Sequence, residues 1–175
     1  MIRFAPLIPQ SGEILDLACG GGRHSRLVLD LGYRVVAADR NIPRFEDLQD
    51  NKFLEIIKTD LESADPFAPN GPLHGRTFTG IIVTNYLHRP ILPELMGALA
   101  DDGVLIYETF AAGNELYGHP RNPDYLLRPG ELLEIARNGV QSGLQVIAYE
   151  HGLVYNPRTA VVQRLCATKT TSGFL

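Results

Sequence analysis

Glu13-Ile14-Leu15-Asp16-Leu17-Ala18-Cys19-Gly20-Gly21-Gly22 is the stretch of sequence that decides the fold. Its first seven residues form a short, mostly apolar run that stops at three glycines, which predicts a buried strand entering a tight turn. The residues from His24 to Leu31 follow with helical spacing, and Gly32 is a suitable end for that helix. A strand, a glycine turn and a helix in this order favour an α/β fold.

The same alternation continues along the chain. Further strands are predicted over residues 34–39, 53–58, 80–84 and 104–108, and helices over 43–50, 90–100 and 129–138. Residues 61–79 and 111–128 read as loops, 101–103 as a turn, and 144–149 and 160–167 as two strands of a hairpin that turns at Asn156-Pro157. We therefore predict a single Rossmann-like, doubly wound, mostly parallel seven-stranded sheet with a C-terminal antiparallel hairpin.

Length and composition favour one globular domain. The chain has 175 residues, of which 45% are hydrophobic and 21% charged, so a real core is expected. We expect the domain to cover residues 1–175, with a core of about 11–168 and a frayed tail at 169–175. No signal peptide and no apolar run of membrane-spanning length is visible, so we predict a cytoplasmic protein without a membrane partner.

The charge and cysteine patterns exclude some partners. The net charge is -4 and the arginines are scattered, which disfavours nucleic-acid binding. Cys19 and Cys166 lie far apart and belong to no CxxC motif, so both are expected to be buried small hydrophobes. No His, Asp or Glu set has metal-ligand spacing, so no metal is predicted.

Four positions in the first half of the chain carry the chemistry of a ligand site. Gly20 and Gly22 let the backbone approach a ligand closely, and Asp16 before them favours a cationic amino acid moiety over a pyrophosphate. The alternative is a glycine-rich structural turn in which Asp16 accepts hydrogen bonds from the turn. S-adenosylmethionine (SAM) carries an amine and a sulfonium, so it fits this acid better than NAD does. Asp39, 19 residues after Gly20, suits ribose hydroxyls, although an acid there can also cap a helix.

The third strand ends at a further candidate pair. Asp60 can accept a hydrogen bond from an adenine amino group, or it can be an ordinary acidic residue of a surface turn. Leu61 offers an apolar contact for the base. Ala18 and Arg40, the neighbours of these motifs, and Asn85 after the fourth strand complete the predicted cofactor-binding set.

Together these residues resemble the SAM-binding half of class I methyltransferases. The pattern Asp16-x-x-x-Gly20-x-Gly22 is similar to their first motif, Asp39 to the ribose-binding acid, and Asp60-Leu61 to the adenine-contacting pair. The Gly-Arg-His-Ser turn is most similar to tellurite-resistance-type and other small-molecule methyltransferases. The resemblance implies SAM as cofactor and a small-molecule substrate. Asn85-Tyr86 lacks the prolines of nucleobase N-methyltransferases, which argues against a nucleobase amine as acceptor.

Catalytic candidates follow the fourth and fifth strands. His88 is a candidate base or substrate orienter, because neutral imidazole works near pH 7, or else a histidine that bonds nearby backbone. Tyr86 is a candidate wall of the methyl pocket, or a core residue. Glu108 ends an apolar strand, so it has a partner, faces the cleft or lies past the sheet.

The long loop after the fifth strand offers polar side chains for a substrate. Tyr107 at the end of that strand and Tyr117, His119, Arg121 and Tyr125 in the loop are predicted substrate contacts. Arg121 suits a carboxylate or phosphate. The alternative is a solvated loop with polar turn residues, and whether the loop is a lid stays open.

Two other functions compete with methyl transfer. The spacing Gly20-x-Gly22-x-x-Ser25 with Asp39 also suits an NAD-linked oxidoreductase, although Asp16 and the terminal hairpin argue against it. A non-catalytic SAM-binding module that acts through a partner is the third interpretation. The methyl acceptor is not determined by any of these residues.

Overall fold

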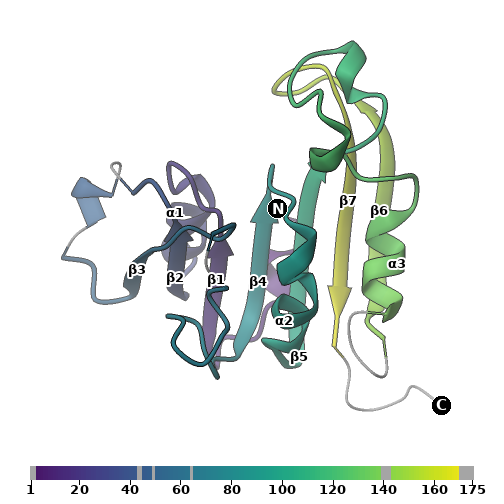
Figure 1. Cartoon of the computed structure of the whole chain (residues 1–175). Helices are drawn as coiled ribbons and strands as arrows, with labels where there is room; N and C mark the ends of the chain where they lie inside the picture. Colours follow the sequence, from purple (N-terminus) through teal and green to yellow (C-terminus); the bar gives the residue numbers. More distant parts are fainter. Residues whose placement is uncertain (1–2, 43–44, 49, 64, 139–142, 170–175) are drawn as a thin grey trace.

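The computed structural model describes residues 3–42, 45–48, 50–63, 65–138 and 143–169. Within these ranges the chain forms a seven-stranded sheet in the order β3-β2-β1-β4-β5-β7-β6 (Figure 1). The strands are β1 (Glu13–Leu17), β2 (Arg34–Asp39), β3 (Leu54–Lys58), β4 (Phe78–Thr84), β5 (Leu99–Phe110), β6 (Gln145–Val154) and β7 (Ala160–Thr168). The α-helices are α1 (Arg23–Asp30), α2 (Leu92–Gly97) and α3 (Glu131–Asn138). Short 3-10 helices are η1 (Ala5–Leu7), η2 (Glu46–Leu48), η3 (Arg89–Ile91), η4 (Asn114–Leu116) and η5 (Pro123–Tyr125).

The predicted topology is confirmed. β3, β2, β1, β4 and β5 pair in parallel, whereas β7 pairs antiparallel with both β5 and β6. The C-terminal hairpin therefore adds its second strand to β5 and leaves β6 at the edge. Because the parallel strands end at the same edge of the sheet, the turns after β1, β2, β3 and β4 meet there.

Helices cover the two faces of the sheet unequally. Alternate strand residues pack with α2 and α3 on one face, where the larger apolar cluster lies. The other face packs α1 and the segment around Ile8 against residues such as Ile14, Ile82 and Ile106. Figure 1 shows α2 and α3 in front of the sheet and α1 behind it.

The region between β4 and β5 departs from the prediction. The helix expected over 90–100 is split into η3 and the six-residue α2, because Leu99 already pairs with Phe78. The turn expected at 101–103 is an irregularity inside β5, where the register with β4 shifts and Asp102 has φ of 59°. Asp102 N–H donates to the Lys169 carbonyl (2.7 Å), so these residues pair with the end of β7 instead of turning freely.

The helix predicted over 43–50 is not an α-helix in the described part of that segment. The described part of this segment contains only the 3-10 helix η2, which directly follows the buried Phe45. A few residues with one buried apolar side chain do not stabilise an α-helix. Asp47 pairs with Arg26 of α1 (2.6 Å), which ties the segment to that helix. The predicted end of α3 at Gly139, Pro43 itself and the frayed tail beyond Lys169 lie outside the described residues.

Candidate functional site

The turn after β1 brings backbone amides to the edge of the sheet. Gly20 and Gly22 have φ of 54° and 72°, a left-handed conformation that glycine adopts without steric cost. A Cβ atom on Gly22 would lie 2.4 Å from the Phe45 ring, whereas a Cβ on Gly20 would meet nothing within 4 Å. Gly22 is therefore needed for packing, and Gly20 leaves open space beside the turn.

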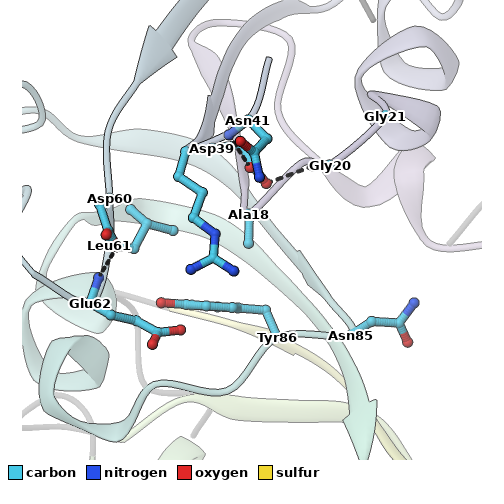
Figure 2. A pocket seen from close by; sticks show the side chains of 11 residues that line it. Ala18, Gly20, Gly21, Asp39, Asn41, Asp60, Leu61, Glu62, Asn85 and Tyr86 are labelled. Carbon is cyan, nitrogen blue, oxygen red and sulfur yellow. Dashed lines mark hydrogen bonds between the residues drawn. The ribbon is translucent and has the colours of Figure 1, made fainter. Parts of the chain in front are cut away.

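Asp39 at the end of β2 faces the same turn. Its carboxylate accepts hydrogen bonds from Gly20 N–H (2.9 Å) and from Asn41 N–H (2.8 Å). Figure 2 shows both bonds and the closeness of Asp39 to the glycine turn. A carboxylate oxygen can accept more than one hydrogen bond, so acceptor capacity remains for hydroxyl groups of a ligand.

Asp60 and Leu61 follow β3, the neighbour of β2. The Asp60 carboxylate accepts a hydrogen bond from Glu62 N–H (3.0 Å), and that bond holds the pKa of Asp60 below its ordinary value. Leu61 is 5% exposed and packs into the core. The turn thus presents a carboxylate beside an apolar surface, the two features that the sequence predicted there.

The end of β4 supplies the opposite wall. Asn85 has a left-handed φ of 55°, and the ring of Tyr86 extends from it toward Glu62 (Figure 2). The Tyr86 hydroxyl is buried and has no hydrogen-bond partner among the described residues. Burial raises the pKa of this phenol, so it stays protonated. An unpaired buried hydroxyl carries a desolvation cost that a bound ligand can relieve.

These turns enclose a cavity of about 450 Å³. A volume of this order suits a small ligand or cofactor. Residues that the sequence analysis placed in the cofactor set and that line the cavity are Ala18, Gly20, Asp39, Arg40, Asp60, Leu61, Asn85, together with the catalytic candidate Tyr86. Gly21, Asn41 and Glu62 also line the cavity, and the only sequence signal for each of them is that it directly follows a predicted residue.

Asp16 lies behind the cavity and not in its wall. It is 1% exposed, and the Ser25 hydroxyl donates to its carboxylate (2.6 Å). Burial raises the pKa of Asp16 to about 6, although the bonds from Ser25 act in the other direction. Asp16 therefore joins β1 to the first turn of α1, which fits the structural alternative for this residue, and its attraction of a ligand amine stays a prediction.

The catalytic candidates His88 and Glu108 and the predicted substrate contact Tyr107 are not among the residues that line the cavity. Tyr107 is 1% exposed, and its hydroxyl donates to the Tyr86 carbonyl (3.0 Å), so it packs in the core and cannot contact a substrate directly. Glu108 pairs with Arg164 of β7 (2.5 Å), so of the three alternatives for this carboxylate the structure shows the one with a partner. His88 precedes η3, and it is absent from the cavity lining found among the described residues.

The loop candidates gather elsewhere. Arg121 lines a second cavity of about 250 Å³, formed by the loop after β5 together with Arg128 and Pro129. Tyr117 and Tyr125 are about half exposed, and the His119 carbonyl accepts a hydrogen bond from Arg158. None of these loop residues lines the larger cavity in the part of the chain that the structure describes.

Arg89 is a structural residue that the sequence analysis missed. Its guanidinium binds the Glu131 carboxylate through two nitrogens (2.7 and 3.0 Å) and donates to the carbonyls of Asp124 and Leu126. It therefore fastens the loop after β5 to the start of α3. No sequence motif indicates this role, because its partners lie 35 to 42 residues away.

His24 is a second residue that the analysis passed over. It lies in the first turn of α1, is 9% exposed, and its Nδ1 is 3.1 Å from the Thr84 hydroxyl at the end of β4. Burial, with Arg23 nearby, lowers the pKa of His24 to about 4, so the ring is neutral near pH 7.

Thiol and metal chemistry find little support in the described ranges. Cys19 is partly buried and Cys166 buried, and burial raises their pKa values to about 12 and about 11. Both are free thiols that stay protonated. Over the residues that the structure describes, no group of three His, Cys, Asp or Glu side chains could hold a metal ion.

Comparisons with known proteins point to one group of enzymes. The family model of tellurite resistance protein TehB matches residues 4–67, which is just over a third of the chain. These residues include the glycine turn, Asp39, Asp60 and Leu61. A comparison with curated proteins gives no match.

Solved structures share the fold over nearly the whole chain. TehB from Haemophilus influenzae is 19% identical with a TM-score of 0.69, covering 97% of this chain and 61% of that one. A SAM-dependent methyltransferase from Methanosarcina mazei is 13% identical (TM-score 0.70), covering 98% and 99%. A Burkholderia thailandensis 1,6-didemethyltoxoflavin-N1-methyltransferase, solved with S-adenosylhomocysteine, is 18% identical (TM-score 0.68), covering 97% and 75%.

The fold expected from the sequence resemblance is therefore confirmed: the chain has the fold of known SAM-dependent methyltransferases. It spans about three fifths of the TehB chain from Haemophilus influenzae. None of the described helices is long and apolar enough to cross a membrane.

Proposed function

We propose that this protein transfers a methyl group from SAM to a small-molecule acceptor. One observation carries the proposal: two carboxylates, Asp39 and Asp60, follow adjacent parallel strands and line one cavity with the glycine turn after β1. A nucleoside needs acceptors for its ribose hydroxyls and for its base amino group, and this pair of acids supplies both.

In this proposal each cavity residue contacts a different part of SAM. Asp39 accepts hydrogen bonds from the ribose, Asp60 accepts one from the adenine amino group, and Leu61 and Arg40 cover the base. Ala18 and the amides around Gly20 and Gly22 approach the amino acid part, with Asn85 on the far side. When bound, SAM supplies an activated methyl group as a sulfonium. The cavity supports this assignment because most of these residues line it.

The choice of SAM as methyl donor is supported by the ligands that were bound in the similar structures. The Burkholderia enzyme was solved with S-adenosylhomocysteine, the demethylated form of SAM. A glycopeptide N-methyltransferase, MtfA, was solved with SAM. Their acceptors differ, so we propose only a small-molecule acceptor for this chain. A single domain, a cytoplasmic location and no nucleic-acid partner complete the proposal, the last because the basic residues are dispersed.

The experiment that tests the proposal is calorimetric titration of the purified protein with SAM, S-adenosylhomocysteine and NADH in parallel. We expect micromolar dissociation constants for the first two ligands and no heat from NADH. Binding of NADH alone would instead favour the dinucleotide alternative, for which Asp39 is equally suited. If none of the three ligands binds, the proposal that the cavity is a SAM site is wrong.

A non-catalytic SAM-binding module is distinguished by turnover. If the protein binds SAM, incubation with SAM and small-molecule acceptors should release S-adenosylhomocysteine. A module that acts only through a partner would bind both ligands at the same site without forming product.

A further inference from the structure

A row of polar side chains crosses the sheet next to the cavity. Thr84 pairs in register with Glu108, Glu108 with Arg164, and Arg164 with Glu150, so these four residues occupy one level on β4, β5, β7 and β6. Arg164 donates to both Glu108 (2.5 Å) and Glu150 (3.2 Å). We call these four residues the polar row.

The polar row lies on the face that carries α1. On one side of the row, the next residues on the same face are Ile82, Ile106 and Cys166, and they belong to the apolar cluster of that face. On the other side of the row, Phe110 and Val162 belong to a separate small apolar cluster. The polar row therefore lies between two buried apolar clusters, and it is the polar part of this face.

The row is open to a ligand. The side chains of Glu108 and Arg164 are 34% and 37% exposed, whereas the strand residues on either side of the row are nearly fully buried. The described elements therefore cover most of this ion pair but leave about a third of each side chain accessible.

His24 connects the row to the cavity. Its ring bonds Thr84, and Thr84 directly precedes Asn85 of the cavity wall. The histidine itself follows the glycine turn by two residues, in the first turn of α1. The polar row therefore begins where the proposed donor site ends. Its other nitrogen, Nε2, makes no hydrogen bond to any described residue.

We propose that the methyl acceptor lies on the polar row and that its N–H or O–H donates a hydrogen bond to His24 Nε2. The proposal rests on the proposed function, since it assigns the second substrate of the same reaction. In this proposal the ring takes the tautomer in which Nδ1–H donates to the Thr84 hydroxyl, which leaves Nε2 as the acceptor. His24 and Glu108 hold the reacting group beside the end of β4.

The charges around the row indicate the chemical class of the acceptor. Arg164 is engaged by Glu108 and Glu150, and Arg23 is the nearby cation that influences His24. The His24 ring is neutral near pH 7, and in the tautomer proposed here its Nε2 atom can only accept a hydrogen bond, which a carboxylate or an oxyanion cannot donate. An uncharged phenol or N–H heterocycle therefore fits this row better than a carboxylate or an oxyanion.

The test is a titration followed by NMR of protein labelled with 15N and saturated with S-adenosylhomocysteine. The probes are phenol and benzimidazole, with benzoate as the charged comparison. We expect the neutral probes to bind with dissociation constants of about 1–10 mM, as small fragments do. They should shift the His24 Nε2 resonance and the amides of the polar row, and benzoate should bind about tenfold more weakly. Shifts confined to the second cavity near Arg121, or no shift at all, would overturn the proposal.

Variants separate the acceptor role from a donor or structural role. His24→Ala should weaken phenol binding about tenfold, the value of one hydrogen bond to a polar partner, and leave the S-adenosylhomocysteine dissociation constant within about twofold. His151→Ala, on the exposed edge strand, is the matched control and should change neither. If His24→Ala does not fold, Thr84→Val removes the ring's partner and should change the Nδ1 resonance and weaken phenol binding.

The outcomes distinguish this inference from the proposed function. If the wild-type protein fails to bind S-adenosylhomocysteine, the proposed function itself is wrong. If it binds that ligand but the probes ignore the polar row, only the acceptor site is wrong. A His24→Ala variant that loses the nucleoside and keeps phenol would place His24 in the donor site and overturn the inference.

Discussion

On one side of β4, the polar groups of the cavity come from short turns that directly follow β1, β2 and β3. Asp39 bonds the amide of Gly20 and Asp60 bonds an amide two residues away, so backbone groups hold these carboxylates. On the other side, polar groups are held by side chains on distant strands and loops. Glu108 bonds Arg164, and Arg89 bonds Glu131.

The difference separates binding from stability. Turn carboxylates held by amides keep free acceptor capacity and line a cavity, so changing them should affect a ligand more than the fold. Paired side chains between distant elements satisfy each other, so changing one leaves its partner uncompensated and should affect the fold more than the ligand. The predictions below test this contrast.

Gly20→Val should give the largest effect on the cavity side. The added side chain enters open space that the proposed donor occupies, and overlap of this kind costs about 1–3 kcal/mol, so the dissociation constant of S-adenosylhomocysteine should rise roughly 100-fold. Gly75→Val is the control, because Gly75 has φ of 67° and equally open surroundings but lies in the β3–β4 loop. Calorimetry that shows the same affinity for both variants would remove the turn from the donor site.

Arg89→Met should give the largest effect on the other side. Glu131 is 5% exposed and would lose both guanidinium bonds, so we expect the free energy of unfolding in urea to fall by about 2–4 kcal/mol. Arg128→Met is the control: Arg128 approaches the same carboxylate at 3.5 Å but is 71% exposed, so its loss should cost less than about 1 kcal/mol. Equal losses would show that burial of the pair is unimportant.

Asp16 and His24, both next to α1, should give opposite pH dependences. The folded-state pKa of Asp16 is about 6 against 3.8, so the folded state binds the extra proton between these values and Asp16 makes the protein less stable as pH rises. The folded-state pKa of His24 is about 4 against 6.5, so the unfolded state binds the extra proton and His24 makes the protein more stable as pH rises.

Urea unfolding at several pH values measures the two contributions. We follow the free energy of unfolding of each variant minus that of the wild type. As the pH rises from 4 to 6, this difference should increase for Asp16→Asn, and as the pH rises from 4 to 6.5, it should decrease for His24→Gln. Each change should reach up to about 3 kcal/mol, the free energy that corresponds to a difference of about two in pKa. Two flat difference curves would mean that neither group is as buried in solution as in this structure.

Asp39→Ala should weaken S-adenosylhomocysteine binding about tenfold to 100-fold, because hydrogen bonds to a charged acceptor contribute about 1.5–3 kcal/mol. The protein should still fold, since the bonds that Asp39 now accepts come from turn amides that water can satisfy. Asp30→Ala, at the exposed end of α1, should leave the dissociation constant unchanged. An unaltered affinity in Asp39→Ala would disprove the ribose assignment.

The smallest expected effect compares two tyrosines. Tyr86→Phe removes an unpaired buried hydroxyl and should raise the free energy of unfolding by up to about 1 kcal/mol. Tyr107→Phe removes a hydroxyl that donates to the Tyr86 carbonyl and should lower it by about 1 kcal/mol. Thermal unfolding of the ligand-free variants measures both, and changes of the same sign would contradict the assigned bonding.

Most of the fold and most of the residues that line the cavity were predictable because both depend on local pattern. The strand-turn-helix order follows from apolar runs that end at Gly20, and Asp39 and Asp60 were identified from their places at strand ends. The turn expected at 101–103 was wrong for a different reason. Pairing of Asp102 with the end of β7 competes with the local preference for a turn, and that partner lies more than sixty residues away.

The sequence by itself determined which residues end each parallel strand, and hence which groups meet at the cavity, because strand and helix periods are properties of short segments. Only the tertiary structure decided that Asp16 is buried, that His24 meets Thr84 sixty residues away, and that Glu108 is held by Arg164 fifty-six residues away. Those contacts depend on strand order and register, and a shift of one residue in register would turn each side chain to the opposite face.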